Sequence, residues 1–419
     1  MLDITQLNAS LSMPGMAGVN AKVPKERVHS PVELPLPLAA ANPKPQVTWR
    51  VTRSCNLNCV SCVSDARPQH YDSELTTGEG IALIKDLGAF QVPRLLFAGG
   101  EPLLRTDLLE FISYARQVGI QPAVFTNGTL LNWEMAVKLK RAGLHSVSIL
   151  LEGIGRHVDR NRGVPGAFNA VLEGYENCQD AGLEVEVRTP LNRWSHRELS
   201  DILDFVERVH IRRVVFSHMV YAGRGNDPQD DMTHEERRRA MDLLLERAED
   251  FQRRGVPIHL ATDENNVDNI YQYLRLARKQ PLQAEAAYRL LQESGAGVRG
   301  AGVGIAGIDS AGDVHPDPYW ESYILGNVRE TLFSKIWGNS AEPLLRGLRD
   351  RLPLLKGKCA NCHWKQACGG SMRVRAEKYF GDAWMPDPAC YLTNKEISHE
   401  VPDQVGAMED DVLLPEQAA

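Results

Sequence analysis

The chain has 419 residues, a length that suits two or three domains rather than one. Its apolar fraction of 43% and charged fraction of 24% are ordinary for a well-cored protein, which excludes a mainly disordered chain and a small disulfide-stapled scaffold. The net charge of -7 comes entirely from the tail 396–419, which contains seven acidic residues and no Lys or Arg. The rest of the chain is balanced in charge, which argues against nucleic acid as a partner because nucleic-acid binding needs a basic surface.

The sequence carries no visible membrane or secretion signal. No apolar run reaches the roughly 18–20 residues that a membrane helix needs, so no membrane span is predicted. The first ten residues, MLDITQLNAS, lack the charged and apolar regions of a signal peptide. We therefore expect a cytoplasmic protein.

Regular structure is predicted from Val47 onward, after a proline-rich leader (1–45) that we expect to be extended or mobile. Short β-branched runs predict six strands, at 47–52, 94–100, 121–128, 145–153, 184–190 and 212–220. Amphipathic patterns predict helices between and after them, at 75–90, 106–119, 132–143, 166–182, 196–209 and 234–254.

Six consecutive βα units predict an α/β fold whose parallel strands are joined by right-handed crossovers. Two architectures satisfy this pattern: a partial, open (β/α)6 TIM-type barrel and a doubly wound sheet. In both, the functional site lies at the carboxyl ends of the strands.

The alternation of predicted strands and helices ends near residue 260. A helical stretch (268–293) precedes a glycine-rich segment and a hairpin that is predicted to turn at Ala311 and Gly312. We therefore divide the chain into a leader (1–45), an α/β core (46–270), a small C-terminal domain (271–395) and an acidic tail (396–419).

Three of the eight cysteines, Cys55, Cys59 and Cys62, follow the first predicted strand with C-x3-C-x2-C spacing. In a reducing compartment, clustered cysteines indicate a metal site rather than disulfides. Three thiolates can hold three irons of a [4Fe–4S] cluster and leave the fourth iron open, as a catalytic centre requires. Zinc is the alternative, although it would need a fourth ligand and the nearest candidate, His70, lies eight residues further on.

Four more cysteines, Cys359, Cys362, Cys368 and Cys390, form a second group in the C-terminal domain. Four thiolates make a closed ligand set, for which tetrahedral zinc is one interpretation and an iron–sulfur cluster another. The remaining cysteine, Cys178, lies within a predicted helix and is expected to be a buried core thiol.

Three short polar motifs close the second, third and fourth predicted strands. They are AGGEP (98–102), TNG (126–128) and LEG (151–153). Each motif alone is a common turn, but parallel strands bring their carboxyl ends to one edge of a sheet. Together with the first cysteine group they indicate one site.

C-x3-C-x2-C after the first strand, combined with GGEP after the second, resembles the radical S-adenosylmethionine (SAM) enzymes over nearly all of 46–395. The resemblance implies that the amine and carboxylate of SAM chelate the open iron. The reduced cluster then cleaves SAM into methionine and a 5′-deoxyadenosyl radical, which abstracts a hydrogen atom. Ser61 departs from the family pattern, in which an aromatic residue or His often precedes the third cysteine.

The resemblance also implies contacts with SAM. Gly99 and Gly100 would allow close backbone approach, Pro102 would fix the turn, and Glu101 would accept a hydrogen bond from the methionyl ammonium. The groups expected to hold the ribose and the amino group are Thr126, Asn127 and Glu152. The candidates for pairing with the SAM carboxylate are Arg162 and Arg188.

The C-x2-C-x5-C spacing of the second group, followed by a distant cysteine, resembles the auxiliary-cluster domain of SPASM-type radical SAM enzymes. It implies a second [4Fe–4S] cluster. Full SPASM domains carry further cysteines upstream, which are missing here, so one auxiliary cluster is expected rather than two.

The stretch from His315 to Cys390, together with SHMVYAGRGN (217–226), resembles the tetrapyrrole-modifying branch of these enzymes. The likeness is greatest to the members that act in haem d1 biosynthesis, which remove propionate side chains from a sirohaem derivative. Members that decarboxylate iron-coproporphyrin to haem b come next. The implied partners are a tetrapyrrole substrate and a low-potential electron donor, either flavodoxin or ferredoxin.

A tetrapyrrole substrate needs cations for its carboxylates and can use an axial ligand to iron. The candidate substrate-binding residues are His218, Tyr221, Arg224 and His315, each of which also has an ordinary structural interpretation. A peptide maturase is an alternative function, although the leader is too short and proline-rich to fold as a peptide-recognition domain. An iron–sulfur electron carrier is another, but a carrier closes each cluster with four ligands.

Overall fold

The computed structural model describes residues 2–5, 44–224, 227–279, 287–288, 291, 297 and 299–398. Its strands form one sheet in the order β1-β8-β7-β6-β5-β4-β3-β2-β9-β10-β11. Their bounds are Leu2–Asp3 (β1), Gln46–Thr52 (β2), Arg94–Gly99 (β3), Gln121–Thr126 (β4), Ser146–Leu150 (β5), Glu184–Leu191 (β6), Arg213–His218 (β7), His259–Asp263 (β8), Ile305–Ile308 (β9), Asp313–His315 (β10) and Gly326–Asn327 (β11).

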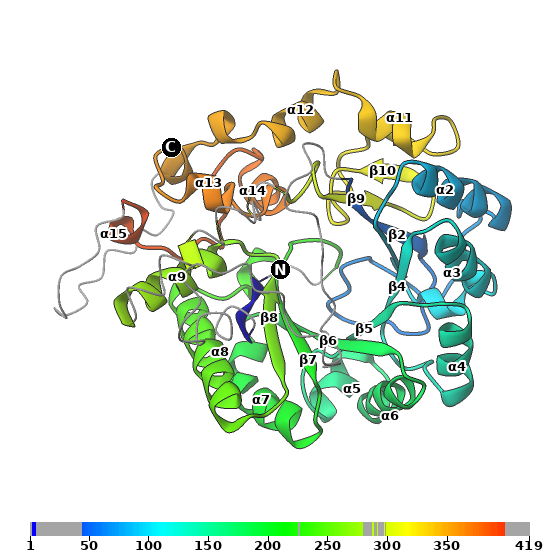
Figure 1. The fold of residues 1–419 in the computed structure, drawn as a ribbon, viewed down its shortest axis with the longest axis horizontal. Coiled ribbons are helices and arrows are strands. Elements are labelled where there is room, and N and C mark those ends of the chain that lie inside the picture. The colour runs from blue at the N-terminus through cyan, green and yellow to red at the C-terminus, as the bar shows by residue number, and fades with distance from the viewer. Residues whose placement is uncertain are drawn as a thin grey trace, which may run out of the picture.

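Helices surround the curved sheet on its outside (Figure 1). Those after the core strands are Thr77–Ala89 (α2), Leu108–Gln117 (α3), Trp133–Arg141 (α4), Arg156–Arg162 (α5), Ala167–Asp180 (α6), Leu199–Arg208 (α7), His234–Arg254 (α8) and Val267–Lys279 (α9). Those of the C-terminal region are Phe333–Gly338 (α11), Pro343–Arg349 (α12), Lys365–Cys368 (α13), Arg373–Phe380 (α14) and Asn394–Ile397 (α15).

The strands β2 to β8 pair in chain order, and every pair is parallel. The predicted partial barrel is therefore confirmed, with one strand more than expected. The seventh strand, β8, was missed because IHLATD is short and is followed directly by the polar residues ENN. The short helix α5 was also missed, since RHVDRNR has only one apolar residue and hence no amphipathic period.

The first residues of the predicted leader are not free. Leu2–Asp3 pairs antiparallel with β8, and Ile4 is fully buried in the core. The prediction that regular structure begins only at Val47 is therefore wrong, because β8 offers Leu2–Asp3 an open sheet edge. Residues 6–43 of the leader and 399–419 of the tail lie outside the described residues.

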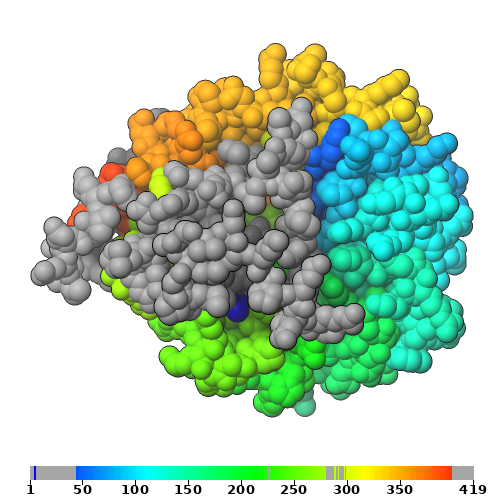
Figure 2. Space-filling view, viewed as in Figure 1, coloured from blue at the N-terminus to red at the C-terminus, as the bar shows by residue number. Residues whose placement is uncertain are grey.

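The C-terminal region continues the sheet of the barrel. β9 pairs in parallel with β2, and the predicted hairpin is present as the antiparallel pair β9 and β10, with Gly312 in its turn at φ +90°. Figure 2 shows the C-terminal segments packed directly beside the first helices of the barrel. The predicted boundary at 270/271 falls inside α9, whereas a domain boundary is expected in a linker.

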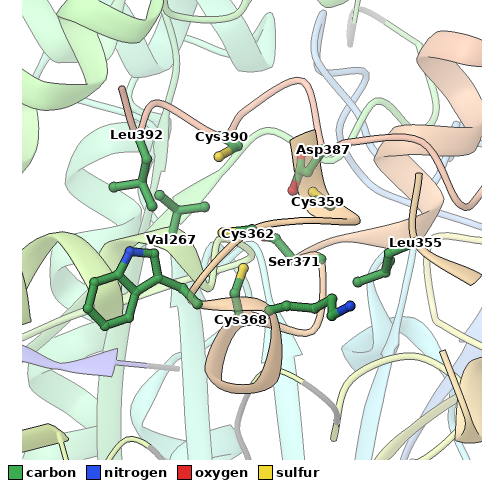
Figure 3. Close-up of a pocket in the computed structure, with 12 residues that line it drawn as sticks. Val267, Leu355, Cys359, Cys362, Cys368, Ser371, Asp387, Cys390 and Leu392 are labelled. Carbon is green, nitrogen blue, oxygen red and sulfur yellow. The ribbon is translucent and has the colours of Figure 1, made fainter. Parts of the chain in front are cut away.

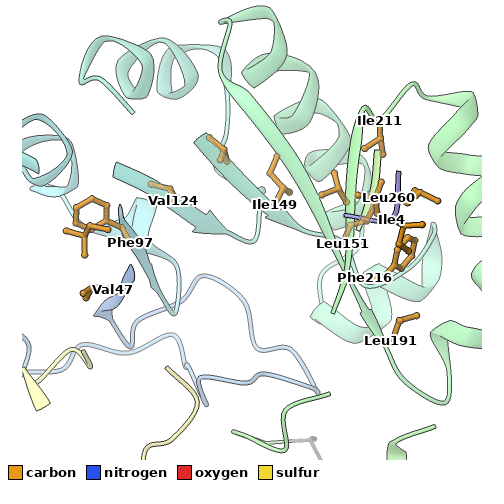
Figure 4. Packing of buried hydrophobic residues seen from close by; sticks show 14 of the residues in the cluster. Ile4, Val47, Phe97, Val124, Ile149, Leu151, Leu191, Ile211, Phe216 and Leu260 are labelled. Atoms are coloured by element: carbon orange, nitrogen blue, oxygen red, sulfur yellow. The ribbon is translucent and has the colours of Figure 1, made fainter. Parts of the chain in front are cut away.

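The main core lies between the sheet and the helices that cover it. Trp49, Phe97 and Phe111 meet there, with ring centroids 5.1 to 6.5 Å apart. Figure 4 shows apolar side chains of successive strands, among them Val47, Phe97 and Val124, within this core. In the described part of the chain, no helix combines the length and apolarity that crossing a lipid bilayer requires. The packed strands fix the positions of the loops that carry the site.

Candidate functional site

The loop after β2 brings Cys55, Cys59 and Cys62 together, packed around Leu57 and Ala66. Backbone amides point at two of the sulfurs: Leu57 N lies 3.4 Å from Cys55 Sγ, and Ala66 N lies 3.4 Å from Cys62 Sγ. Burial raises the pKa of Cys59 to about 12 and also raises that of Cys55. A raised pKa means that losing the thiol proton is costly in the empty site. A bound metal would offset this cost, because it stabilises the thiolate and displaces the proton. Three thiols in one loop, two of them with N–H donors on their sulfurs, fit an iron–sulfur cluster.

Gly99 and Gly100 lie against the beginning of this cysteine loop. A Cβ atom on Gly99 would lie 2.2 Å from Thr52 O, and one on Gly100 would lie 2.1 Å from Ser54 O. Gly99 also has φ +141°, which side chains rarely adopt. The amides of Gly100 and Glu101 donate to Thr52 O and Ser54 O, at 2.7 and 2.8 Å. The glycine pair therefore holds the end of β3 against the start of the cysteine loop.

Glu101 is fully buried between the ends of β3 and β4. Its carboxylate accepts hydrogen bonds from Thr126 Oγ1 at 2.8 Å, Asn127 N at 2.8 Å and Leu103 N at 3.1 Å. Burial raises its pKa to about 7, and the three hydrogen bonds oppose that rise. A carboxylate has about four lone-pair sites, so three donors leave room for one more.

Asn127 links the Glu101 network to the cysteine loop. Its Nδ2 donates to Asn56 Oδ1 at 2.9 Å and lies 3.9 Å from Cys55 Sγ. Its carbonyl accepts a 2.7 Å hydrogen bond from Arg162 Nη1. Sequence reasoning did not single out Asn56, although its place directly after the first cysteine could have suggested it.

Arg162 is fully buried, and all its nitrogens have partners. Nε and Nη2 donate to the Glu152 carboxylate at 3.0 and 2.9 Å, and Nη2 also donates to Leu150 O at 2.6 Å. Arg162 therefore joins the ends of β4 and β5 and holds Glu152 in place. Asn161, also missed from the sequence, donates to Glu152 at 3.3 Å and accepts from Val60 N at 2.9 Å through its carbonyl.

Arg188 belongs to a different network from the other predicted SAM residues. It pairs with Glu186 at 2.9 Å and with Asp263 at 2.5 Å, across the inside of the barrel. Near it lie two further acids that sequence reasoning missed. Burial raises the pKa of Glu264 to about 8 and that of Asp317 to about 6. Both follow strands, and this position is the signal that could have found them.

Two of the four predicted substrate residues are buried in polar networks. His218 Nε2 lies 2.9 Å from Asp268 Oδ2, and both side chains are fully buried. The hydroxyl of Tyr221 donates to Asp231 at 2.7 Å, and burial raises its pKa. These positions favour structural roles for both residues.

The other two predicted substrate residues also have protein partners. Arg224 turns toward the cysteine loop and donates to Cys59 O at 3.0 Å and Ala66 O at 2.7 Å. His315 is buried in the β10 strand, where its Nδ1 lies 2.9 Å from Tyr323 O. Each of the four predicted substrate residues is therefore engaged by protein neighbours of its own.

The second cysteine group lines a pocket with about 360 Å³ of empty space, part of it open to solvent. Cys359, Cys362 and Cys368 come from the segment that ends in α13, and Cys390 comes from a later segment on the rim of the same space (Figure 3). Burial raises the pKa of Cys359 to about 12 and also raises those of Cys362 and Cys368.

Zinc and an iron–sulfur cluster are the two interpretations of this ligand set. Among the described residues, no three His, Cys, Asp or Glu side chains are placed to hold a single metal ion. Tetrahedral zinc needs every sulfur about 2.3 Å from one centre. Four thiols that line one pocket can also supply the ligands of a polynuclear iron–sulfur cluster. Cys178, in contrast, is a fully buried thiol of α6, as predicted.

Two buried arginines of α14 support this pocket and were missed from the sequence. Arg375 forms two hydrogen bonds of 2.7 Å with Asp387, which lines the pocket, and also donates to Met219 O at 2.6 Å, just beyond β7. Arg373 donates to Ala383 O at 2.8 Å. The pocket is thereby fixed directly to the barrel.

Comparison with known proteins places this geometry in a family. Residues 49–206 match the model of the Radical SAM superfamily. The chain is 43% identical to the Fe-coproporphyrin III synthase of Methanosarcina barkeri, over 85% of this chain and 90% of that protein. It is 39% identical to the pre-heme d1 synthase of Dinoroseobacter shibae, over 86% of this chain and 89% of that protein.

A solved structure supports the fold. The structure described as native anSMEcpe with bound AdoMet superposes with a TM-score of 0.63 at 17% identity, over 86% of this chain and 96% of that one. At this identity the likeness concerns the fold alone. The family assignment rests on the matched family model and on the two synthases named above. The chain matches 90% and 89% of their lengths. The chain therefore belongs to the radical SAM superfamily and is an enzyme whose cofactors are SAM and a [4Fe–4S] cluster.

Proposed function

We propose that the enzyme removes or shortens carboxylate-bearing side chains of an iron tetrapyrrole. The observation that carries this proposal is the similarity to two tetrapyrrole synthases over 85% and 86% of the chain. This similarity extends from the barrel through the C-terminal region. When bound, SAM and its reduced cluster supply a 5′-deoxyadenosyl radical for hydrogen abstraction from the substrate.

For the first cluster, the proposed ligands are Cys55, Cys59 and Cys62. For SAM, the proposed contacts are the loop Gly99–Pro102 together with Thr126, Asn127 and Glu152. The buried network around Glu101 supports this assignment, because its carboxylate keeps one lone-pair site for an ammonium donor. Arg162 is proposed to act indirectly, by orienting Glu152 and the Asn127 carbonyl.

Arg188 is the proposed partner of the SAM carboxylate. To form this pair, Arg188 has to give up one of its two present carboxylate partners. Its guanidinium already faces two carboxylates, those of Glu186 and Asp263. A third carboxylate, that of SAM, would have to compete with both of them for Arg188.

For the second cysteine group, we propose a second [4Fe–4S] cluster bound by Cys359, Cys362, Cys368 and Cys390. The four thiols that line one pocket support this proposal, because they supply the four ligands that such a cluster needs. We also propose that the C-terminal cluster region begins after α9 rather than at residue 271, because the sequence-based boundary divides that helix.

The finer proposal is a role in haem d1 biosynthesis, with a sirohaem-derived substrate that loses propionate side chains. The 39% identity to a pre-heme d1 synthase supports it. A second candidate is formation of Fe-coproporphyrin III, which the 43% identical relative favours and which sequence reasoning did not consider. A low-potential flavodoxin or ferredoxin is the proposed electron donor.

Binding of an iron tetrapyrrole is the first test. Titration of the anaerobic holoenzyme into a sirohaem-derived ligand or iron-coproporphyrin should shift the Soret band of the ligand and saturate at one equivalent. A small peptide serves as the competing ligand. Binding of the peptide alone, with no Soret shift for either tetrapyrrole, would favour a peptide maturase instead.

A further inference from the structure

The segment that follows β7 reaches back across the barrel to the first cysteine loop. Arg224 stands at the centre of this contact. Its side chain is only 21% exposed, and its backbone amide donates to Cys62 O at 3.0 Å. The loop is thus held by a residue more than 160 positions away in the chain.

Each nitrogen of the Arg224 guanidinium has a partner in the same loop. Nε donates to Cys59 O at 3.0 Å, and Nη2 donates to Asn58 Oδ1 at 2.9 Å. Nη1 donates to Ala66 O at 2.7 Å and to Asp65 Oδ1 at 3.0 Å. Counting the amide, Arg224 bonds to the backbone of two proposed cluster ligands and to three neighbouring positions.

Gly223 allows this close approach. It has φ +65°, and a Cβ atom there would lie 2.1 Å from Cys62 O and 2.5 Å from Val63 C. Any other residue would push the segment away from the loop. Gly223 therefore permits the close approach to Cys62, and Arg224 makes the hydrogen bond to its carbonyl.

The loop needs such support because its own backbone has few regular partners. Its other anchors include the hydrogen bonds from Cys55 N to Arg67 O and from Val60 N to Asn161 O. Three thiolates must meet three irons at once, so the loop has to hold its shape. The charge of Arg224, which Asp65 offsets in part, and its hydrogen bonds to the loop also favour the more negative, reduced state of the cluster, because nearby charge and hydrogen bonds set a cluster's potential.

We propose that Arg224 is a positioning residue for the first cluster, which holds the cysteine loop in shape and raises the cluster's reduction potential. The proposal rests on the family assignment and not on the identity of the tetrapyrrole. It replaces the carboxylate-binding role that the sequence suggested, since every guanidinium nitrogen already has a partner. The two roles make different predictions.

The test compares Arg224→Gln, Arg224→Lys and the matched control Arg67→Gln, each as the full-length anaerobic holoenzyme. Arg67 carries the same charge on the same loop, but its side chain is half exposed and pairs with Asp65. The measurements are the midpoint potential of the first cluster and its EPR spectrum with and without SAM. The signal of the second cluster reports whether each variant has folded.

We expect Arg224→Gln to lower the midpoint potential of the first cluster and to change its SAM-dependent spectrum. Compared with Arg224→Gln, Arg224→Lys should recover part of the midpoint potential but not the spectrum. Lysine keeps the positive charge but lacks the planar set of N–H donors that binds several loop atoms at once. Arg67→Gln should resemble the unaltered enzyme. If Arg224→Gln leaves the potential and the spectrum unchanged and loses only product formation, the proposal is overturned. Arg224 would then be assigned to substrate binding, as the sequence suggested. An equal shift in Arg67→Gln would overturn the proposal as well.

A second measurement applies if Arg224→Gln cannot hold the first cluster. The metal-free full-length chain is treated with iodoacetamide, and mass spectrometry follows alkylation at each cysteine. Cys55 is only 7% exposed, so its alkylation requires the loop to open. Alkylation of Cys55 should be about tenfold faster in Arg224→Gln. Cys178, fully buried in α6, should react at the same slow rate in both chains, and equal rates at Cys55 would contradict the proposal.

Discussion

The hydroxyl of Thr126, at the end of β4, donates a 2.8 Å hydrogen bond to the carboxylate of Glu101, just beyond β3. Both side chains are buried, and the next residue, Asn127, adds a second bond to the same carboxylate and reaches the cysteine loop through its amide. One buried carboxylate thereby organises the ends of two strands beside the proposed SAM site.

Glu101→Gln should weaken SAM binding and leave the iron content unchanged. The substitution removes the negative charge that we propose for the methionyl ammonium, and a charge-assisted hydrogen bond is worth roughly 1.5–3 kcal/mol. Equilibrium dialysis of SAM against the anaerobic holoenzyme measures the affinity, with iron analysis on the same samples. Unchanged SAM affinity would mean that Glu101 only supports the turn.

The pKa of Glu101 predicts a pH dependence of stability in the SAM-free protein. Its pKa rises from 4.5 to about 7 on burial, so the folded state binds a proton more tightly than the unfolded state. The stabilisation is complete below pH 4.5 and is lost as the pH rises toward 7, by about 3 kcal/mol or less at 1.36 kcal/mol per unit. Urea unfolding at several pH values should show this slope, and Glu101→Gln should flatten it.

Gly99→Ala should destabilise the protein by about 2–4 kcal/mol, because the new Cβ meets Thr52 O at 2.2 Å in a backbone conformation that alanine disfavours. Gly78→Ala is the control, since a Cβ there meets nothing within 4 Å and alanine suits its position in α2. Denaturant unfolding compares the two. Equal stability of both variants would show that the β3 end can shift without cost.

Arg162→Lys should lower both stability and SAM affinity. Lysine cannot reproduce the bidentate contact with Glu152 and also reach the Asn127 and Leu150 carbonyls. Breaking a buried ion pair costs about 3–5 kcal/mol when one partner is removed, so the loss for a retained charge should be smaller. Arg160→Lys, on the exposed side of α5, provides the control and should change neither quantity.

Replacing Cys359 and Cys362 with alanine should reduce the iron content from about eight to about four per chain, which corresponds to losing one of two four-iron clusters. SAM cleavage by the remaining cluster should stay measurable. The Cys178→Ala variant should keep all its iron, since Cys178 is buried in α6 away from both groups. Stoichiometric zinc in the anaerobically purified protein would contradict the second cluster.

The barrel was predictable because its strands are buried β-branched runs separated by amphipathic helices. The run VTWRVT, for example, became β2 with Val47, Trp49 and Val51 buried. The grouping of Cys55, Glu101 and Asn127 was also predictable, because parallel strands carry their ends to one edge. The positions of apolar and polar residues along the chain were sufficient to predict both the barrel and this grouping.

The partners of individual side chains could not be predicted. An arginine after a strand looks the same in sequence whether it faces substrate or protein, and Arg224 turned toward the cysteine loop 165 residues away. His218 likewise met Asp268 of α9, fifty positions later. Such contacts depend on how loops from distant strands pack, which no local pattern records.

Anaerobic turnover tests the central claim most directly. The holoenzyme is incubated with SAM, a low-potential reductant and, in parallel, a sirohaem-derived tetrapyrrole, iron-coproporphyrin or a small peptide, and the products are identified by mass spectrometry. We predict 5′-deoxyadenosine together with a tetrapyrrole product of lower mass, from the sirohaem-derived substrate in particular. A modified peptide with both tetrapyrroles unchanged would contradict the account.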